Sequence, residues 1–362
     1  MKLFLRILSV LILPLLLTGS VNYLIDPDYT LRKDYIPEAA SALANGKLLS
    51  GPINANGRLL KREWIKQLEH HPEVLVLGSS RTMGVTQDLF AGKSFFNASV
   101  SNCTFQDMYA FADLVEKKQN GFPDEIIVCC DQWLFGNSFR EKRWLYNRKN
   151  FLRILQKSGK ISPGNFPKKW ELQKEWIKEL FSVRYFLRSL KQFGKPEKFE
   201  IRDTVHPEKS MLLPDGSRLL PLQITEADPD EVNEKAKAYF YSSGDEMFTQ
   251  PDPLQCLLFE NLISYLQKKD CKLTLFIPPY HPLTWQLLHQ SEKHAGIFNV
   301  DNYLQNLAEK YTFRLVGATN PSALKLTSSD FYDGVHLKKE ALSPFIHSDS
   351  LTQRKPNRKV LP

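Results

Sequence analysis

Short apolar runs recur along the chain, and stretches with helical spacing separate them. The five runs cover residues 74–77, 94–98, 125–130, 272–277 and 312–316. The first of them reads Val-Leu-Val-Leu, a continuous apolar run typical of a strand that is buried on both faces of a parallel sheet. Apolar residues at three- and four-residue spacing predict helices over 105–118, 254–268 and 300–310. The alternation predicts a three-layer α/β/α domain with a five-stranded parallel sheet, whose ligands bind at the carboxyl ends of the strands.

Residues 137–250 interrupt this alternation. They contain no apolar run typical of a buried strand, but basic amphipathic helices are predicted over 148–157 and 168–193, and a hairpin over 211–220. We therefore expect a mainly helical cap inserted after the third strand, so that the core consists of residues 58–136 and 251–346. A polar connector is expected over 26–57. The polar, basic end of the chain, residues 347–362, is expected to be a disordered tail.

The N-terminal residues 1–25 contain an uncharged, mostly apolar run over 7–25. As a helix this run would extend about 28 Å, close to the hydrocarbon thickness of a bilayer. Lys2 and Arg6 precede the run, whereas acidic residues follow it, so the positive-inside rule places the rest of the chain across the membrane. We expect a transmembrane anchor, with a cleaved signal peptide as the alternative because residues 18–20 are small.

The positive charge of the chain is local. The sequence has 48 Lys and Arg against 40 Asp and Glu, a formal net charge of +8, yet residues 140–198 alone hold 17 basic against 5 acidic side chains. This part of the cap is also aromatic, and it would suit anionic lipid headgroups or an acidic glycan. A helical lid whose charges only face water is an equally good interpretation. Nucleic acid is not an expected partner, because the anchor places the domain away from it.

Cysteine and histidine spacing gives no sign of a metal or a cofactor. Five cysteines in 362 residues cannot form a disulfide scaffold, and none lies in a C-x-x-C pair. The only close histidine pair, His70 and His71, would point in different directions on a helix. We therefore expect neither a metal site nor a cofactor.

Two short motifs carry the candidate chemistry. Gly78-Ser79-Ser80 directly follows the first predicted strand, where a serine at the start of a helical turn faces the cleft. Asp333 and His336 form a D-x-x-H motif after the last strand, in which the carboxylate can orient the imidazole while the other ring nitrogen faces a serine. Each motif alone is weak, since serine often caps helices. Their convergence at one edge of the sheet predicts a catalytic triad.

The sequence resembles the SGNH (GDSL-type) hydrolase superfamily in short blocks that fall in the order of that family. Gly78-Ser79-Ser80 is similar to its first block, the segment 97–102 with Thr104 and Asp107 to its second, and Asp333 with His336 to its last. The resemblance covers about residues 70–135 and 255–345. It implies a flavodoxin-like fold, Ser80 as nucleophile, His336 as base and Asp333 as the residue that orients it. The backbone N–H groups of Ser80 and Asn102 would form the oxyanion hole.

Two positions depart from that family pattern. Asn102 stands where an oxyanion-hole glycine is usual, although its backbone N–H can still donate and asparagine tolerates unusual φ/ψ values. Asp131 stands where a donor asparagine is usual, and an ionised carboxylate cannot donate. Either Gln132 substitutes as the donor, or the two backbone N–H groups suffice, or Asp131 binds something else. Arg81, Asp131 and His281 are candidate substrate contacts, and His281 lies in a Pro-Tyr-His-Pro segment that would equally suit a rigid loop.

The resemblance is strongest to the membrane-anchored bacterial branch that adds or removes acyl groups on exported glycans. It implies a single-pass inner-membrane protein with its catalytic domain in the periplasm, acting on an acylated carbohydrate or another acyl ester, with other membrane subunits of a glycan-modification system as further partners. Two alternatives stay open. The domain has lost catalysis and serves as a glycan-binding or scaffold subunit, or the basic cap binds membrane and the substrate is a lipid-linked acyl chain.

Overall fold

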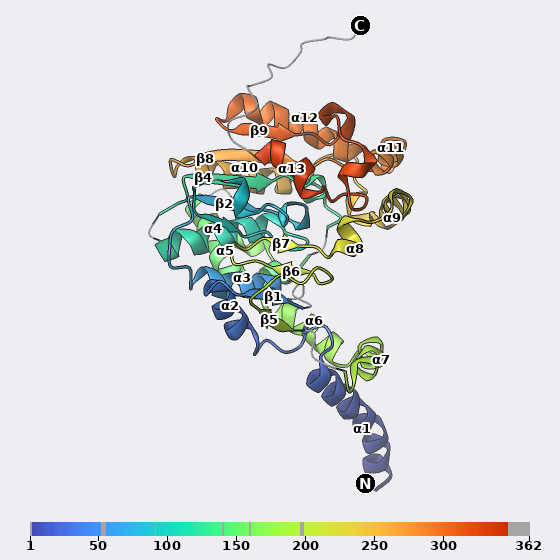
Figure 1. The fold of residues 1–362 in the computed structure, drawn as a ribbon. Helices are drawn as coiled ribbons and strands as arrows, with labels where there is room; N and C mark the ends of the chain where they lie inside the picture. The colour runs from blue at the N-terminus through green and yellow to red at the C-terminus, as the bar shows by residue number, and fades with distance from the viewer. Residues whose placement is uncertain are drawn as a thin grey trace.

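The computed structural model describes residues 2–51, 56–90, 92–119, 121–139, 141–158, 161–195 and 199–346. The tail predicted over 347–362 lies outside the described residues. Figure 1 shows helix α1 (Lys2–Ile25) projecting from the rest of the chain, on the side opposite the central sheet.

Five strands form the central sheet in the order β3-β2-β4-β8-β9. Their bounds are β2 (Val74–Leu77), β3 (Phe95–Asn97), β4 (Glu125–Cys129), β8 (Lys272–Ile277) and β9 (Arg314–Gly317). Every neighbouring pair is parallel, which confirms the predicted five-stranded parallel sheet. If the five strands of this sheet are numbered 1 to 5 along the chain, their order in the sheet is 2-1-3-4-5. The direction in which successive strands are added to the sheet therefore reverses between β2 and β4. Ligands of open parallel sheets bind at the carboxyl ends of the strands beside such a reversal.

Both faces of this sheet are buried, as the apolar runs predict. Successive side chains of a strand point to opposite faces, and the strands contribute alternate residues to a larger buried cluster (Leu75, Leu77, Ile126, Val128, Leu273, Leu275) and to a smaller one (Val74, Val76, Ile127, Cys129, Phe276, Val316). The larger cluster is completed by α3 (Gly57–Ile65), α4 (Phe105–Gln119), α5 (Arg148–Ser158), α10 (Pro253–Gln267) and α12 (Ala295–Lys310). On the other face, α13 (Lys339–Ile346) contributes Leu342, Phe345 and Ile346.

A second, antiparallel sheet joins the connector to the cap. Its order is β5-β1-β6-β7, with β1 (Leu48–Ser50), β5 (Glu200–Arg202), β6 (Met211–Leu212) and β7 (Arg218–Leu219). Strands β6 and β7 form the predicted hairpin. The turn of this hairpin lies on the core, since the Asp215 carbonyl accepts from the Asn97 N–H at 2.8 Å and the buried Lys61 ammonium donates to the Gly216 carbonyl. The connector and the hairpin thus close over one end of the core sheet.

The remaining helices are α2 (Ile36–Ala44), α6 (Trp170–Leu180), α7 (Val183–Gln192), α8 (Leu222–Thr225), α9 (Pro229–Ser242) and α11 (Pro282–His289). The sequence predicted one helix over 168–193, whereas the structure has two. The break falls at Ser182, whose extended backbone and side chain cap α7 by accepting the Tyr185 N–H at 3.1 Å. Against the predicted span over 7–25, no helix among the residues that the structure describes is both long and apolar enough to cross a membrane.

Candidate active site

Ser80 lies at the carboxyl end of β2, in a single 3-10 turn (Ser80–Thr82). Gly78 precedes the turn at a point where a Cβ would overlap neighbouring side chains of the turn and of β4. Ser79 is fully buried, and its hydroxyl accepts the Arg81 N–H at 3.2 Å, so this serine caps the turn. Ser80 is partly exposed. Of the two adjacent serines, Ser80 is therefore the one whose hydroxyl is open to a ligand.

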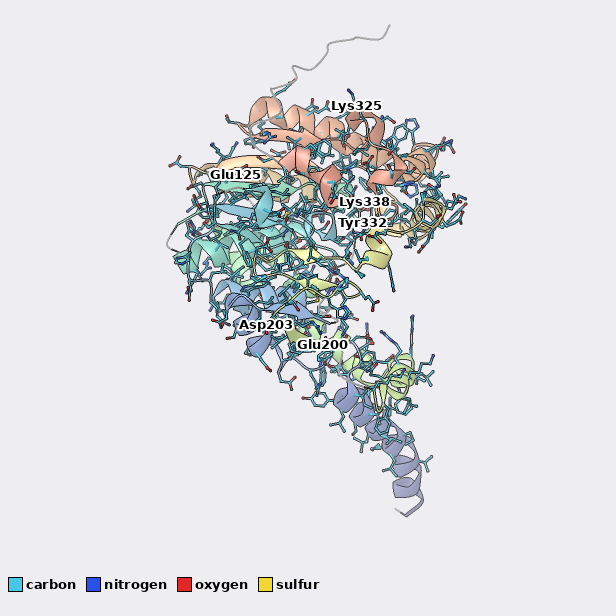
Figure 2. All side chains as sticks on the ribbon, viewed as in Figure 1. Glu125, Glu200, Asp203, Lys325, Tyr332 and Lys338 are labelled. Carbon is cyan, nitrogen blue, oxygen red and sulfur yellow. The ribbon has the colours of Figure 1, made fainter. Side chains whose placement is uncertain are left out.

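His336 is held by the loop between η9 (Ser328–Asp330) and α13. The carboxylate of Asp333 accepts the backbone N–H of Val335 and that of His336, both at 2.9 Å, and so closes the turn between them. The Tyr332 N–H donates to the His336 carbonyl at 2.9 Å, which fixes the loop further. Figure 2 labels Tyr332 beside the C-terminal part of the core, where this loop lies.

The serine turn and the histidine loop meet. The Nε2 atom of His336 lies 2.8 Å from the Ser80 Oγ, and its Nδ1 lies 2.8 Å from Oδ2 and 3.0 Å from Oδ1 of Asp333. Because the carboxylate accepts from Nδ1, Nε2 is left as the acceptor for the serine hydroxyl. The side chains of His336 and Asp333 are 27% and 34% exposed, so solvent and ligand reach the pair. The structure thus brings together all three predicted catalytic residues.

The Asp333 carboxylate is held in its charged form. Burial acts to raise its pKa, but the charge and hydrogen bond of His336 and the N–H groups of Val335 and His336 outweigh burial and hold the pKa of Asp333 well below its usual value. The carboxylate is therefore ionised at neutral pH, as is required to stabilise an imidazolium on the adjacent ring.

The two segments that hold the predicted oxyanion-hole donors, Ser80 and Asn102, lie side by side. In the serine turn the N–H groups of Arg81 and Thr82 both donate to Ser79, which leaves the Ser80 N–H, the first of the turn, for a ligand. The second block lies alongside, because the Val100 N–H donates to the Gly78 carbonyl at 3.0 Å. Ser80 and Asn102 each follow this pair by two residues. Both of the predicted backbone donors therefore lie on adjoining segments.

Asn102 adopts a left-handed backbone with φ of 51°, which asparagine tolerates better than most residues. Its carbonyl accepts from the Arg58 guanidinium at 2.7 Å, and the same guanidinium forms a buried ion pair with Asp107 at 2.8 Å. Asp107 also accepts the Thr104 N–H at 2.9 Å. The unusual backbone at Asn102 is thus held from outside by a buried network, which keeps the direction of its N–H fixed.

Gln132 is not a donor to the oxyanion hole, contrary to the prediction. Its amide nitrogen donates to the Pro278 carbonyl at 2.9 Å and to the Thr319 hydroxyl at 2.7 Å, and its amide oxygen accepts from Arg81 at 3.0 Å. The side chain is fully buried. Gln132 therefore ties the end of β4 to the segments after β8 and β9 and has no donor left for substrate.

Asp131, also predicted as a substrate contact, is fully buried behind the serine turn. One of its carboxylate oxygens lies 3.8 Å from the Arg81 guanidinium. Burial raises the pKa of Asp131, and the nearby Arg81 charge opposes that effect. Asp131 has no exposed atoms. Its carboxylate therefore faces the Arg81 guanidinium and is not open to a substrate.

Arg81 is likewise buried, and it joins the two halves of the site. Its guanidinium donates to the Val335 carbonyl at 3.1 Å, directly before His336, and to the Pro279 carbonyl. Its backbone follows Ser80. The predicted substrate contact at Arg81 is thus replaced by a structural one, because the guanidinium holds the histidine loop against the serine turn.

His281 is fully buried as well, which argues against the predicted substrate contact. Its Nδ1 accepts the Leu283 N–H at 3.1 Å and so caps α11, and its backbone N–H donates to the Gly334 carbonyl at 3.0 Å. Burial lowers the pKa of His281 to about 4, although the Asp333 charge acts to raise it. His281 is therefore neutral at pH 7, and its backbone N–H holds the loop that carries His336.

Sequence reasoning missed Glu246 at the edge of this site. Its carboxyl accepts hydrogen bonds from the hydroxyls of Tyr239 and Tyr280, both at 2.7 Å. The centroid of the Tyr280 ring lies 4.7 Å from the Cζ atom of Arg81. Glu246 lies in a short polar turn of the sequence, which gives no sign of burial. Its neighbours come from α9 and from the loop after β8, so only the fold reveals the cluster.

A cavity of about 170 Å³ lies beside the serine turn. Its walls come from α3, the serine turn, the second block and the hairpin, through Leu60, Lys61, Met83, Val100, Ser101 and Leu212 among others. Met83 follows Ser80 by three residues, and Ser101 directly precedes Asn102. The cavity therefore adjoins the segments that hold Ser80 and Asn102, although neither of these residues lines it, and the hairpin forms one of its walls.

Among the described residues, no group of His, Cys, Asp and Glu side chains is arranged to hold a metal ion. Comparison with protein-family models, with curated proteins and with solved structures found no match to the chain.

Proposed function

We propose that this protein is a serine esterase or O-acyltransferase of the SGNH hydrolase type that acts on acyl esters of cell-surface carbohydrate. The observation that carries the proposal is the continuous hydrogen-bonded path from Ser80 Oγ through His336 to Asp333, with both steps at 2.8 Å. Residues at opposite ends of the core meet in the arrangement that nucleophilic acyl transfer needs.

In the proposed reaction Ser80 Oγ attacks the acyl carbonyl carbon while His336 Nε2 accepts the hydroxyl proton. The carbonyl oxygen becomes an oxyanion that accepts from the backbone N–H groups of Ser80 and Asn102. When the tetrahedral intermediate collapses, the bond to the leaving alcohol breaks and His336 returns the proton to that oxygen. Water completes hydrolysis of the acyl-serine, or a sugar hydroxyl completes transfer, with His336 again taking and returning one proton.

Three features support the SGNH assignment. The 2-1-3-4-5 order of the core strands is that of flavodoxin-like sheets. The second block lies against the serine turn, where the Asn97 side chain donates to the carbonyls of Thr82 and Val85 at 2.8 and 2.9 Å. The D-x-x-H motif supplies both remaining members of the triad. These features support the family on geometry, since the comparisons give no relative.

The cavity favours a short acyl group. An apolar cavity of roughly 150 Å³ holds a benzene molecule, which has six carbon atoms. The cavity next to the serine turn measures about 170 Å³, and its walls carry polar groups of Lys61 and Arg218 besides apolar side chains. An acyl chain of about six carbon atoms therefore fills it. Acetyl and other short acyl groups would fit, whereas a long fatty chain would not.

We further propose that α1 attaches the protein to the bacterial inner membrane, with the domain in the periplasm and other membrane subunits of a glycan-modification system as partners. The described side chains of α1 favour this, since Val10, Leu13, Leu16 and Leu17 are each more than half exposed. Such an exposed apolar helix needs a nonpolar environment. Lys2 and Arg6 before the apolar run and Asp26 and Asp28 after it support the orientation.

A second candidate is an inactive glycan-binding or scaffold subunit. One observation favours it: Gln132 has no free donor and Asp131 is a buried carboxyl, so no side chain from the end of β4 supports the oxyanion. Loss of one such donor typically lowers the rate by about 10² to 10³. The two backbone donors remain, which is why catalysis is the preferred proposal.

A short-chain aryl ester assay on the full chain separates the two candidates. We expect turnover by the wild type, at least a 10³-fold loss in Ser80→Ala, and unchanged turnover in Ser322→Ala, which removes an exposed serine at the same end of the sheet. A fluorophosphonate probe should label the wild type and not Ser80→Ala. Equal rates and equal labelling in wild type and Ser80→Ala would remove the catalytic proposal and leave the binding subunit.

A further inference from the structure

Helix α7 carries an exposed apolar row. Val183, Leu187 and Leu190 follow one another at spacings of four and three residues, which places them on one face of a helix. They are 68%, 55% and 49% exposed. Three large aliphatic side chains in one unburied row on a helix of ten residues require an explanation, because single exposed apolar residues are ordinary but contiguous ones mark an interaction surface.

A basic row lies directly beside it. Arg184, Arg188 and Lys191 each follow a member of the apolar row by one residue, so they occupy the adjoining face of α7. The third face, with Tyr185 and Ser189, is buried. Helix α7 therefore has one face packed on the protein and two exposed faces, one apolar and one basic. This is the pattern of helices that lie in a membrane interface.

Helix α6 adds a second exposed apolar row, beside charged residues of both signs. Trp170, Ile177 and Phe181, spaced seven and four residues apart, are 45%, 51% and 39% exposed. The two lysines of α6 are ion-paired within the helix, Lys174 with Glu171 at 3.8 Å and Lys178 with Glu175 at 3.1 Å, and the Lys174 ammonium also lies 3.6 Å from the Trp170 ring centroid. Aromatic rings with nearby lysines suit the level of lipid headgroups, where the ring is in contact with acyl chains and the charge with phosphate.

Both helices are fixed against α1 (Figure 1). The buried Asn22 amide nitrogen donates to the carbonyls of Leu180 and Ser182 at 2.9 and 3.1 Å. The amide oxygen of Asn22 accepts from the Ser189 hydroxyl at 3.2 Å. Arg188 forms an ion pair with Asp28, just past the end of α1. The polar groups in the last turns of α1 are thus covered by α6 and α7, and the apolar row of α6 reaches α1 through the Phe181 ring, which lies against Gly19.

We propose that the exposed apolar residues of α6 and α7 (Trp170, Ile177, Phe181, Val183, Leu187 and Leu190) dock on an anionic lipid surface, with Arg184 and Lys191 on phosphate headgroups. The surface is continuous with the apolar α1, and its charge is complementary to an anionic leaflet. A second copy of the chain fits less well, because a two-fold contact through this face would oppose two basic rows. The inference is separate from catalysis and shares with the proposed function only the location at a membrane.

Hydrogen exchange on the full chain tests the docking. The chain is placed in nanodiscs of phosphatidylcholine, with or without phosphatidylglycerol, and in detergent micelles. We expect exchange in α6 and α7 to slow at least about tenfold in the anionic discs relative to the neutral ones, and to recover as salt is raised. Leu187→Asp with Leu190→Asp, and separately Arg184→Glu with Lys191→Glu, should abolish this protection.

The matched control is Val205→Asp with Leu222→Asp, which replaces two side chains of similar exposure away from α1. Its protection should equal that of the wild type. Equal exchange in anionic and neutral discs would overturn the proposal, as would protection that depends on protein concentration in detergent, because the face would then bind a second copy. Ester hydrolysis in micelles is measured on the same variants, so loss of docking with intact hydrolysis leaves the proposed function standing.

Discussion

The imidazole of His336 lies 2.8 Å from the hydroxyl of Ser80, although 256 positions separate the two residues in the chain. The serine follows the first strand of the core and the histidine follows the last. They meet because β2 is an interior strand beside the central β4, and the loop after β9 folds back across the carboxyl ends of the strands. Arg81 holds this junction closed, since it follows the serine in sequence and donates to the carbonyl that precedes the histidine.

Replacing Asp333 by asparagine should reduce kcat by about 10³ to 10⁴ with little change in KM. The amide would donate to Nδ1 of His336 and so leave the proton on Nε2, where the base must accept one. The side chain keeps its size and can still accept the two backbone N–H groups. Esterase kinetics and circular dichroism of the same preparation check the prediction, and a variant that is folded and fully active would rule out the orienting role.

Asn102 offers a test of the oxyanion hole that leaves the side-chain chemistry aside. Asn102→Gly should retain the positive φ and the backbone donor, with kcat within about threefold of wild type. Asn102→Val should lose at least 1 to 2 kcal/mol of stability, or shift the N–H and lose kcat, because a β-branched residue is strained there. Thermal unfolding and kcat are measured on both. Similar behaviour of the two variants would show that φ at 102 is unimportant.

Arg81→Lys should lower kcat by about 10- to 100-fold and leave KM nearly unchanged. A lysine has a single ammonium, and it cannot reach the carbonyls of Val335 and Pro279 and the Gln132 oxygen at once. The histidine loop would then move relative to the serine. If Arg81 contacted substrate instead, KM would rise, so the division of the effect between kcat and KM decides between positioning and binding.

These residues show which parts of the site a sequence can reveal. The strands and the two catalytic motifs were predictable, because a continuous apolar run and a D-x-x-H spacing are local patterns. The roles of Arg81, Gln132 and His281 were not, because each depends on carbonyls and hydroxyls from other segments, such as Thr319 for Gln132. All three were predicted near the site, and all three lie there with their side chains turned into the protein.

The cap shows the same limit at the level of whole elements. The basic amphipathic stretch gave the helical content of α6 and α7, but the break between them depends on one serine cap. The small sheet was visible only as a hairpin, because β1 and β5 have three residues each and carry no periodicity. Their pairing joins the connector to the cap, which no local pattern could indicate.

Glu246 should make stability depend on pH in a defined direction. Burial raises the pKa of Glu246 to about 7, above its value in the unfolded chain. The folded state thus binds this proton more tightly, so the stabilisation is complete below about pH 4.5 and is lost as pH rises through 7. From pH 5 to 8 the wild type should lose about 2 to 3 kcal/mol relative to Glu246→Gln. Urea unfolding of both proteins checks this, and parallel curves against pH would contradict it.

The cavity beside the serine turn should set the length of the acyl chain. Leu212 lines it from β6, and Leu212→Ala removes three carbon atoms from the wall. The wild type should hydrolyse aryl esters with a sharp decline in kcat/KM beyond about six acyl carbons. The alanine variant should move that limit about two to three carbons upward, and Leu212→Phe should move it downward.

A gain of activity on longer chains cannot result from misfolding. Leu219→Ala, on the neighbouring strand and outside the cavity wall, should leave the profile unchanged. If all three variants retain Ser80-dependent hydrolysis with the wild-type profile, the acyl chain lies elsewhere and the catalytic proposal is unaffected.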